Sequence, residues 1–146
     1  MANVLDSEPA YVPDGFSLRR RIPQGAEPGF GRIKDQTVLI YTTGWSDSDW
    51  NYPLVFYVAL PGAPELVATE QRPGSRVELP GGLTGEYHDG IWVAQVDAHA
   101  NFVGMQWREG GTHSITVRTP RASLAVRGPR SLATSELARM LSSFPS

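Results

Sequence analysis

The chain has 146 residues, and its 13 basic and 15 acidic residues give a formal net charge of −2. This length suits a single domain with one hydrophobic core, and the near balance of charge argues against binding to a nucleic-acid backbone or an anionic membrane surface. The absence of cysteine excludes disulfide bonds, thiolate metal sites and thiol nucleophiles.

The first residues carry neither a targeting signal nor a membrane signal. The stretch MANVLDSEPA has no basic region and no apolar core, so it does not resemble a secretory signal peptide. No apolar run approaches the ~20 residues of a membrane helix. We expect a chain that does not insert into a membrane, with a flexible segment over residues 1–10 and a single β-rich domain over residues 11–146.

Short segments rich in branched and aromatic residues alternate with turns of Gly, Pro and Asp along the chain. This pattern predicts about eight strands without an internal repeat. The expected strands are Phe16–Ile22, Gln36–Thr43, Leu54–Leu60, Arg76–Leu79, Thr84–His88, Ile91–Asp97, Phe102–Arg108 and His113–Thr119.

The segment GWSDSDWNYP, residues 44–53, joins two of these strands and is the main candidate site. Aromatic side chains flanked by carboxylates are typical of ligand or partner sites, and the two aspartates favour a basic or hydrogen-bond-donating partner whose binding weakens with salt. We expect at least one of its tryptophans to be exposed. The alternative is that the aromatic rings fold back and cap the core. The candidate binding residues are Trp45, Asp47, Asp49, Trp50 and Tyr52.

The same loop partly matches a calcium-binding loop. Asp47, Asp49 and Asn51 place oxygen donors on every second residue, as the first half of such a loop requires. The second half does not match, because Tyr52 stands where the sharp-turn glycine belongs and Val58 replaces the bidentate glutamate. We therefore expect no bound metal.

A first hairpin is expected in EYHDGIWV. The dipeptide Asp89–Gly90 favours a tight two-residue turn, which places Tyr87 opposite Trp92. His88 would then lie at the tip of the hairpin, in solvent. The following strands continue this pattern and predict an antiparallel meander from Thr84 to Thr119.

A second hairpin is expected in WREGGTHSITV. Apolar residues alternate with polar ones on both sides of the glycines, so the two apolar sets must share a face. Only a three-residue turn, Glu109–Gly111, achieves this, and it places Trp107 opposite His113 and Met105 opposite Ile115.

This stretch also holds the densest group of acid, base and hydroxyl side chains, Glu109, His113 and Ser114. A nucleophile and its base must approach within about 2.6–3.2 Å. Because neighbouring strand residues point to opposite faces, His113 and Ser114 cannot do so. We interpret His113 as a core or rim histidine beside Trp107, with a ligand-binding or pH-sensing role as the alternative.

The stretch SLATSELARMLSSF predicts a C-terminal amphipathic helix with Thr134 as its N-cap and Glu136 in its first turn. A helix on a membrane surface is the alternative, but Arg139 is its only basic residue. The predicted class is therefore α+β, a mainly antiparallel sheet with a helix packed on it. The helical face expected to be buried consists of Leu137, Met140, Leu141 and Phe144.

Four short stretches follow one another along the chain: YVPDGFSL (11–18), TVLIYTTG (37–44), MQWREGGTHSITV (105–117) and LATSELARMLSSF (132–144). Together they resemble the uncharacterised domain found at the C-terminal, extracytoplasmic ends of bacterial anti-sigma factors and in lipoprotein-like proteins. The resemblance implies a curved antiparallel sheet with a packed helix, similar to lipoprotein-carrier and sigma-regulator sensor domains. It implies an extracytoplasmic, signalling role and no catalytic residue.

Sequence motifs of common enzyme classes are missing, among them the Gly-x-Ser-x-Gly elbow, the phosphate-binding glycine loop, the dinucleotide fingerprint and His-Glu-x-x-His. We expect a non-catalytic sensor or interaction domain without a cofactor. It would bind a protein segment, a peptide or an apolar ligand on the concave face of the sheet or at residues 44–53. The alternative is a small hydrolase or metal-dependent enzyme that uses His88, His99, Asp47 and Asp49.

Overall fold

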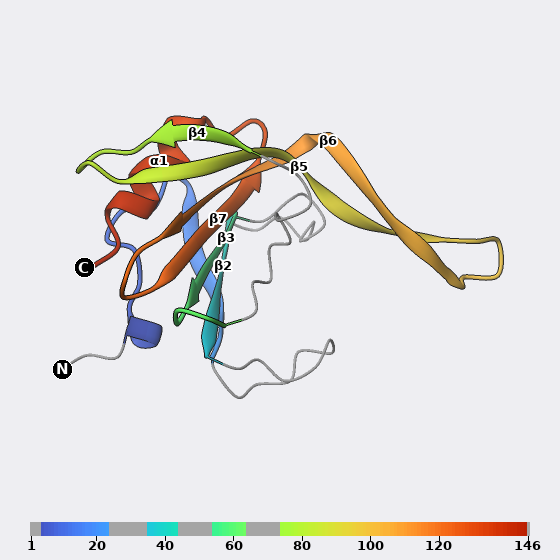
Figure 1. Ribbon diagram of the computed structural model, residues 1–146, viewed down its shortest axis with the longest axis horizontal. Coiled ribbons are helices and arrows are strands. Elements are labelled where there is room, and N and C mark those ends of the chain that lie inside the picture. Colours follow the sequence, from blue (N-terminus) through green and yellow to red (C-terminus); the bar gives the residue numbers. More distant parts are fainter. Residues whose placement is uncertain (1–3, 24–34, 44–53, 64–73, 146) are drawn as a thin grey trace.

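The computed structural model describes residues 4–23, 35–43, 54–63 and 74–145 (Figure 1). Within these residues, seven strands form one antiparallel, curved sheet, and a helix follows the last strand. This arrangement confirms the predicted α+β class. The elements are the 3-10 helix η1 (Val4–Asp6), the strands β1 (Phe16–Ile22), β2 (Gln36–Thr43), β3 (Leu54–Ala59), β4 (Ser75–Glu78), β5 (Thr84–Val96), β6 (Phe102–Arg118) and β7 (Ser123–Pro129), and the helix α1 (Thr134–Ser142).

The sheet consists of two meanders that meet at β3 and β7, in the order β1-β2-β3-β7-β6-β5-β4. β7 was not predicted, because Gly128–Pro129 resembles a turn. The glycine is instead required by packing, since a Cβ at Gly128 would lie 3.1 Å from Leu54 and 3.3 Å from Leu137 of the helix. A residue without a side chain lets α1 approach the sheet closely at this point.

The two hairpins predicted around Gly90 and Glu109–Gly111 are wrong. β5 and β6 each continue past these glycines and pair with one another. The turn that connects them lies at residues 97–101, between the segments predicted as the strands Ile91–Asp97 and Phe102–Arg108. Trp107 pairs with Trp92 and not with His113. The glycines mark an irregularity in the pairing. Asp89 pairs with His113 and Ile91 with Arg108, so Gly90 alone lies opposite residues 109–112 of β6, as in a β-bulge.

The helix prediction is confirmed. Leu137, Met140, Leu141 and Phe144 are all buried, and the ring of Phe144 stacks on Phe56 of β3 with 5.7 Å between ring centroids. The N-cap, however, is Ala133, which makes no side-chain capping bond, and the predicted cap Thr134 is the first helical residue. Among the described residues, no helix is long and apolar enough to cross a membrane.

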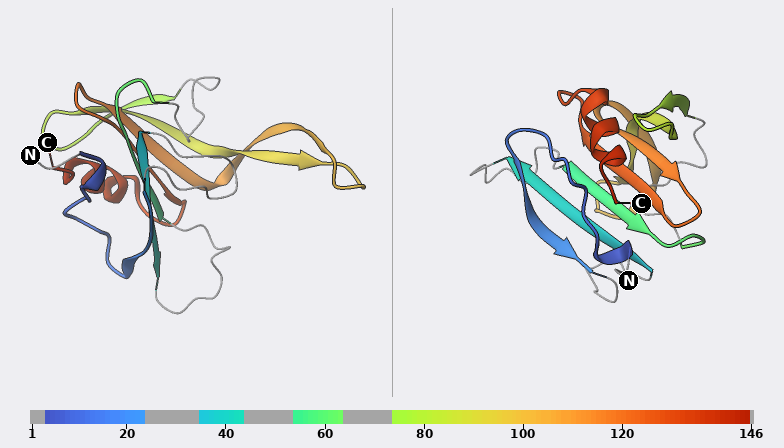
Figure 2. Two further views of the ribbon diagram at one scale, coloured as in Figure 1. Left: turned by 90° about the horizontal axis from the view of Figure 1, so that it is seen from below. Right: turned by 90° about the vertical axis from the view of Figure 1, so that its left-hand side faces the viewer.

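Residues 4–10 lie against the body of the protein, within the segment 1–10 for which flexibility stays a prediction. Leu5 is buried in the main core, and its carbonyl oxygen accepts a hydrogen bond from the hydroxyl of Thr37 at 2.8 Å. The amide of Ala10 donates to the carbonyl oxygen of Ser143 at 3.2 Å, next to the helix end. η1 and α1 thus lie on the same side of the sheet (Figure 2). The burial of Leu5 and these two hydrogen bonds hold residues 4–10 against the body.

Candidate functional site

The loop predicted as the binding site lies outside the described residues. Trp45, Asp47, Asp49, Trp50 and Tyr52 all fall within residues 44–53, so their role as a binding surface stays a prediction.

A two-stranded arm, residues 90–108, projects from the body (Figure 1). At its base, β4 pairs with β5 up to Tyr87, and β7 pairs with β6 from Thr112 onward. Beyond these points each strand of the arm pairs only with the other among the described strands. Both outer edges of the arm therefore present backbone groups that a further strand could pair with.

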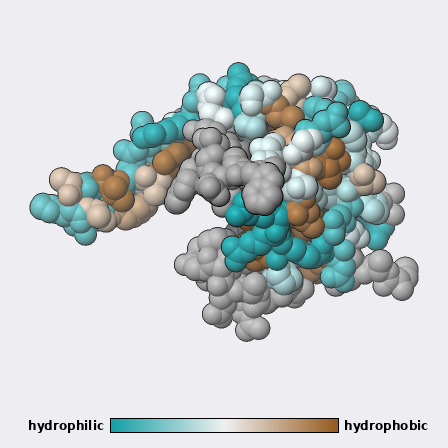
Figure 3. All heavy atoms as spheres, turned by 180° about the vertical axis from the view of Figure 1, so that it is seen from behind, coloured by the Kyte–Doolittle hydropathy of each residue, from teal (hydrophilic) through white to brown (hydrophobic). Residues whose placement is uncertain are grey.

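One face of the arm is apolar from base to tip. The cross-strand pairs Trp92–Trp107, Ala94–Met105 and Val96–Phe102 follow one another on it, because residues opposite each other in a ladder share a face. Toward the tip this face is uncovered, and Figure 3 shows apolar surface along the arm. The exposed fractions are 61% for Val96, 65% for Phe102, 63% for Val103 and 52% for Met105.

The opposite face of the arm is mixed, because Gln95, Gln106 and Arg108 lie on it beside Ile91 and Val93, and hydrogen bonds hold the tip. The amide of Gln95 donates to the side-chain oxygen of Gln106 across the strands. At the tip, the carboxylate of Asp97 accepts hydrogen bonds from the backbone amides of His99 at 2.8 Å and Asn101 at 3.0 Å. These amides, that of Asn101 first, lower the pKa of Asp97, so the turn holds a stable negative charge.

Two tryptophans anchor the arm to the body. Trp92 and Trp107 meet edge to face with 5.4 Å between ring centroids, a favourable geometry for aromatic pairs. The indole nitrogen of Trp107 donates to the carbonyl oxygen of Asp89 at 3.0 Å. Its ring also contacts His88 edge to face at 6.3 Å. The apolar face of the arm thus begins at a pair of tryptophans that these contacts hold in place.

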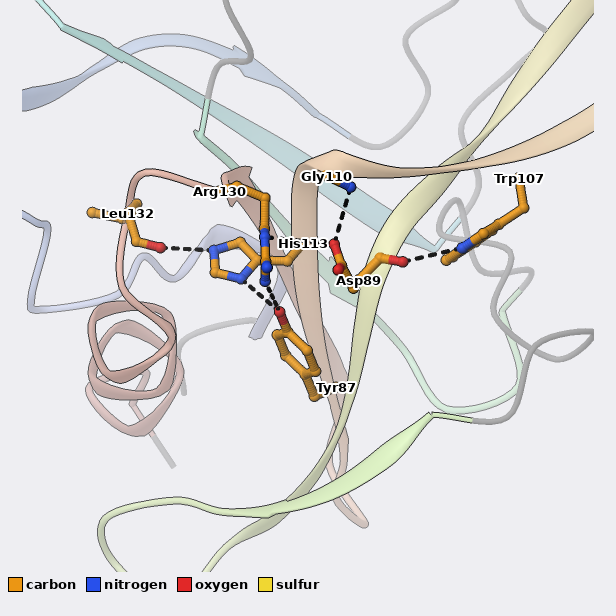
Figure 4. A network of polar contacts seen from close by, with 7 residues as sticks. All are labelled: Tyr87, Asp89, Trp107, Gly110, His113, Arg130 and Leu132. Carbon is orange, nitrogen blue, oxygen red and sulfur yellow. Dashed lines mark hydrogen bonds and ion pairs between the residues drawn. The ribbon is translucent and has the colours of Figure 1, made fainter.

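The carboxylate of Asp89 ties the irregular part of β6 to the body (Figure 4). It accepts a hydrogen bond from the backbone amide of Gly110 at 3.3 Å and lies 3.6 Å from the guanidinium nitrogen Nε of Arg130. The backbone amide of Arg130 in turn donates to the carbonyl oxygen of Gly111 at 3.1 Å. The residues that the sequence placed in a hairpin turn are therefore held against the segment that follows β7.

His113 links this network to the segment that precedes the helix. Its Nε2 atom lies 2.7 Å from the carbonyl oxygen of Leu132, and its Nδ1 atom lies 3.0 Å from the hydroxyl of Tyr87 (Figure 4). A carbonyl can only accept, so Nε2 carries the proton and Nδ1 accepts from Tyr87. The guanidinium of Arg130 donates to the same hydroxyl oxygen at 2.7 Å. Neutral His113 therefore satisfies both of its hydrogen-bond partners, the carbonyl of Leu132 and the hydroxyl of Tyr87.

Burial is the main cause that lowers the pKa of His113, although the carbonyl of Leu132 opposes it. The folded state therefore binds fewer protons than the unfolded state just below pH 6.5, the ordinary pKa of histidine, and stability must fall as the pH drops through that range. We expect His113→Gln, which keeps a donor for Leu132, to weaken this dependence.

Urea unfolding at about pH 7.5 and about pH 5.5 measures the effect. The loss of stability between the two values should be smaller in His113→Gln than in the wild type, whereas the exposed control His99→Gln should keep the wild-type difference. Equal pH dependence in the wild type and His113→Gln would contradict this assignment.

The two other histidines are not brought together. His88, predicted at a hairpin tip, is only 3% exposed and lies within β5, with its Nε2 3.3 Å from a carboxylate oxygen of Glu86. His99 lies in the exposed turn at the far end of the arm. In the part of the chain that the structure describes, no three His, Cys, Asp or Glu side chains form a group that could hold a metal ion. A polar pocket of about 180 Å³ opens at the arm base beside His88, Asp89 and Glu109.

Comparison of the chain with models of protein families, with curated proteins and with solved structures finds no match. The interpretation of the site therefore depends on the chain's own residues. The sequence analysis did not identify Arg130 as part of the site or Phe102 as exposed. The pattern that could have indicated the apolar face of the arm is the unbroken alternation through Val103, Met105 and Trp107. That pattern was interpreted as the inward face of a half-buried strand.

Proposed function

We propose that the protein is a non-catalytic interaction domain that binds a partner protein through the apolar face of the arm. The observation that carries this proposal is the row of exposed large apolar side chains on a projecting ribbon, Val96, Phe102, Val103 and Met105. A contiguous apolar patch on a protein surface is typical of an interaction site.

The energetics of the arm support a bound partner. A two-stranded hairpin is at best marginally stable in water, and a further packing layer or strand is needed to stabilise it. Full burial of a Phe or Met side chain contributes about 1.5–3 kcal/mol. A partner that covers Phe102 and Met105 would therefore stabilise both the complex and the arm itself.

The charges of the arm indicate the chemistry of the partner. Within residues 90–108 only Asp97 and Arg108 are charged. Asp97 lies at the tip, and Arg108 lies on the other face of the arm from Met105. The apolar face offers no charged group, so the partner is expected to present an apolar segment. This association should depend little on salt, in contrast to one that uses the acidic loop at residues 44–53.

The base of the arm is fixed before a partner arrives. Trp107 and, just beyond the arm, Gly110 are both hydrogen-bonded to Asp89, so the order that a partner adds is confined to the outer part of the arm. The resemblance of the sequence to the extracytoplasmic domain of anti-sigma factors adds support for a partner-binding, signalling role outside the cytoplasm.

The test uses two adjacent positions on opposite faces of the arm. A photo-cross-linking phenylalanine replaces Met105 in one variant and Gln106 in the other, in cells that produce the chain. We expect the Met105 position to yield a defined adduct whose partner can be identified by mass spectrometry and purified. Met105→Ser and Phe102→Ser should then weaken binding to the purified partner by about tenfold each, since each removes a buried contact.

Gln106→Ser is the matched control and should bind like the wild type. Equal adducts from the two positions, or equal affinity of all variants, would contradict docking on the apolar face. Light scattering of the purified protein identifies a special case: a dimer that Met105→Ser converts to a monomer would show that the partner is a second copy of the chain.

A further inference from the structure

A second apolar feature lies between the end of the helix and the β6–β7 turn, away from the arm. It is a cavity of about 380 Å³ that opens to the surface. Its inner wall consists of buried side chains from β7 and from the helix end, and its outer wall comes from the segment after β4 and from η1. The residues that shape it are Leu124, Leu141 and Phe144 inside, Val4 and Leu83 outside, and Arg121 among the residues around it.

The cavity offers a ligand almost no polar group. The Thr119 hydroxyl, which lines it, donates to the carbonyl oxygen of Ala122 at 3.0 Å and accepts from the amide of Ala122 at 3.1 Å. The amide of Thr119 donates to the same carbonyl at 2.8 Å. Because these groups satisfy one another, a ligand inside the cavity must be apolar.

Arg121 is the exception. Its side chain is exposed beside the cavity, and it makes no hydrogen bond or ion pair with any residue that the structure describes. No acidic residue of the described part of the chain lines the cavity to neutralise it. A guanidinium is matched in geometry and charge by a carboxylate or a phosphate. An apolar cavity with an unneutralised arginine beside it thus favours a ligand that has an apolar part and an anionic group.

We propose that this cavity binds a free single-chain amphiphile, with its aliphatic tail among Leu83, Leu124 and Phe144 and its anionic head on Arg121. The volume falls within the range of small-molecule sites, about 300–1,000 Å³, which are mostly lined by apolar side chains with a few polar groups that fix the ligand's orientation. The site is distinct from the arm, so it goes beyond binding of a partner protein.

The test is titration calorimetry of the purified chain with octanoate, decanoate, decanol and decyltrimethylammonium, each below its micelle concentration. Decanoate should bind more tightly than octanoate, by about fourfold for each added methylene that enters the cavity. It should also bind more tightly than decanol by about tenfold or more, because the charged head contacts Arg121. The cationic amphiphile should bind most weakly.

Three variants locate the site. Arg121→Ala should remove the preference for decanoate over decanol, and Leu83→Trp, at a half-buried wall position, should fill the cavity and abolish binding of both. Arg108→Ala, on the arm, is the control and should bind like the wild type. Met105→Ser should also bind normally, which separates this proposal from docking on the arm.

Several outcomes would overturn the proposal. They are the absence of decanoate binding, decanoate binding that survives Leu83→Trp, and equal affinity for decanoate and decanol. Binding to vesicles of anionic phospholipid without binding of free decanoate would overturn it in favour of a membrane surface. A change of oligomeric state in Leu83→Trp without any decanoate binding would overturn it in favour of a second copy of the chain.

Discussion

Deletion of residues 132–146 is expected to leave the chain unable to fold. The helix contributes Leu137, Met140 and Leu141 to the core, all of them almost fully buried. Loss of one such side chain typically costs about 2–5 kcal/mol, and the whole stability of a domain is about 5–15 kcal/mol. Circular dichroism and gel filtration of the truncated chain should show loss of the cooperative unfolding transition and aggregation. An unchanged transition would contradict the role of the helix.

A point variant tests the same interface with less disruption. Leu137→Ala should lower the free energy of unfolding by about 2–5 kcal/mol, because Leu137 packs against the sheet beside Gly128 and no solvent can fill the cavity that the change leaves. The control is Ser135→Ala on the exposed side of the helix, which should change stability by less than about 0.5 kcal/mol. Similar losses in both variants would contradict burial of the predicted face.

Gly90→Ala is expected to cost about 2–5 kcal/mol of stability. Gly90 has a φ of 111°, a conformation that residues with side chains rarely adopt. A Cβ there would also collide with the carbonyl oxygen of Arg108 and would lie 2.8 Å from the indole nitrogen of Trp107. The substitution therefore adds a steric clash at the arm base to backbone strain.

Gly110→Ala is the matched control. Gly110 also has a positive φ, 94°, but a Cβ there would meet no atom within 4 Å. Its substitution should cost only the backbone strain, about 1 kcal/mol. Urea unfolding followed by tryptophan fluorescence gives both values. If the two variants lost equal stability, the close approach of Gly90 to Trp107 would be contradicted.

Local patterns were sufficient for most elements of the fold. The helix was predictable because the spacing of Leu137, Met140 and Leu141 belongs to a helix and no other element. β7 was not predictable in this way. Its glycine and proline resemble a turn, and the reason for Gly128 is a contact with a helix that follows it in the chain.

The arm shows a different limit of sequence analysis. Alternation defines which residues of a strand share a face, but it does not define the strand with which they pair. Trp107 was therefore assigned to the correct kind of element and to the wrong partner. Exposure was equally hidden, because Met105 has the same alternating environment in the sequence whether or not another layer covers it.

The network at the arm base could not be predicted from the sequence. Tyr87, His113 and Arg130 come from β5, from β6 and from the segment after β7, and only the order of the strands brings them together. The predicted site residues from Trp45 to Tyr52 lie outside the described part of the chain, so that interpretation is neither confirmed nor contradicted.

The pairing of β3 with β7 has a consequence for how the chain folds. The two strands are neighbours in the sheet, yet β7 follows β3 only after the whole of β4, β5 and β6. Until β7 has been synthesised, the first meander has an unpaired edge of buried apolar residues at β3, a hazard for aggregation on the ribosome. Because contacts between residues far apart in sequence form slowly, we expect this junction to limit the folding rate.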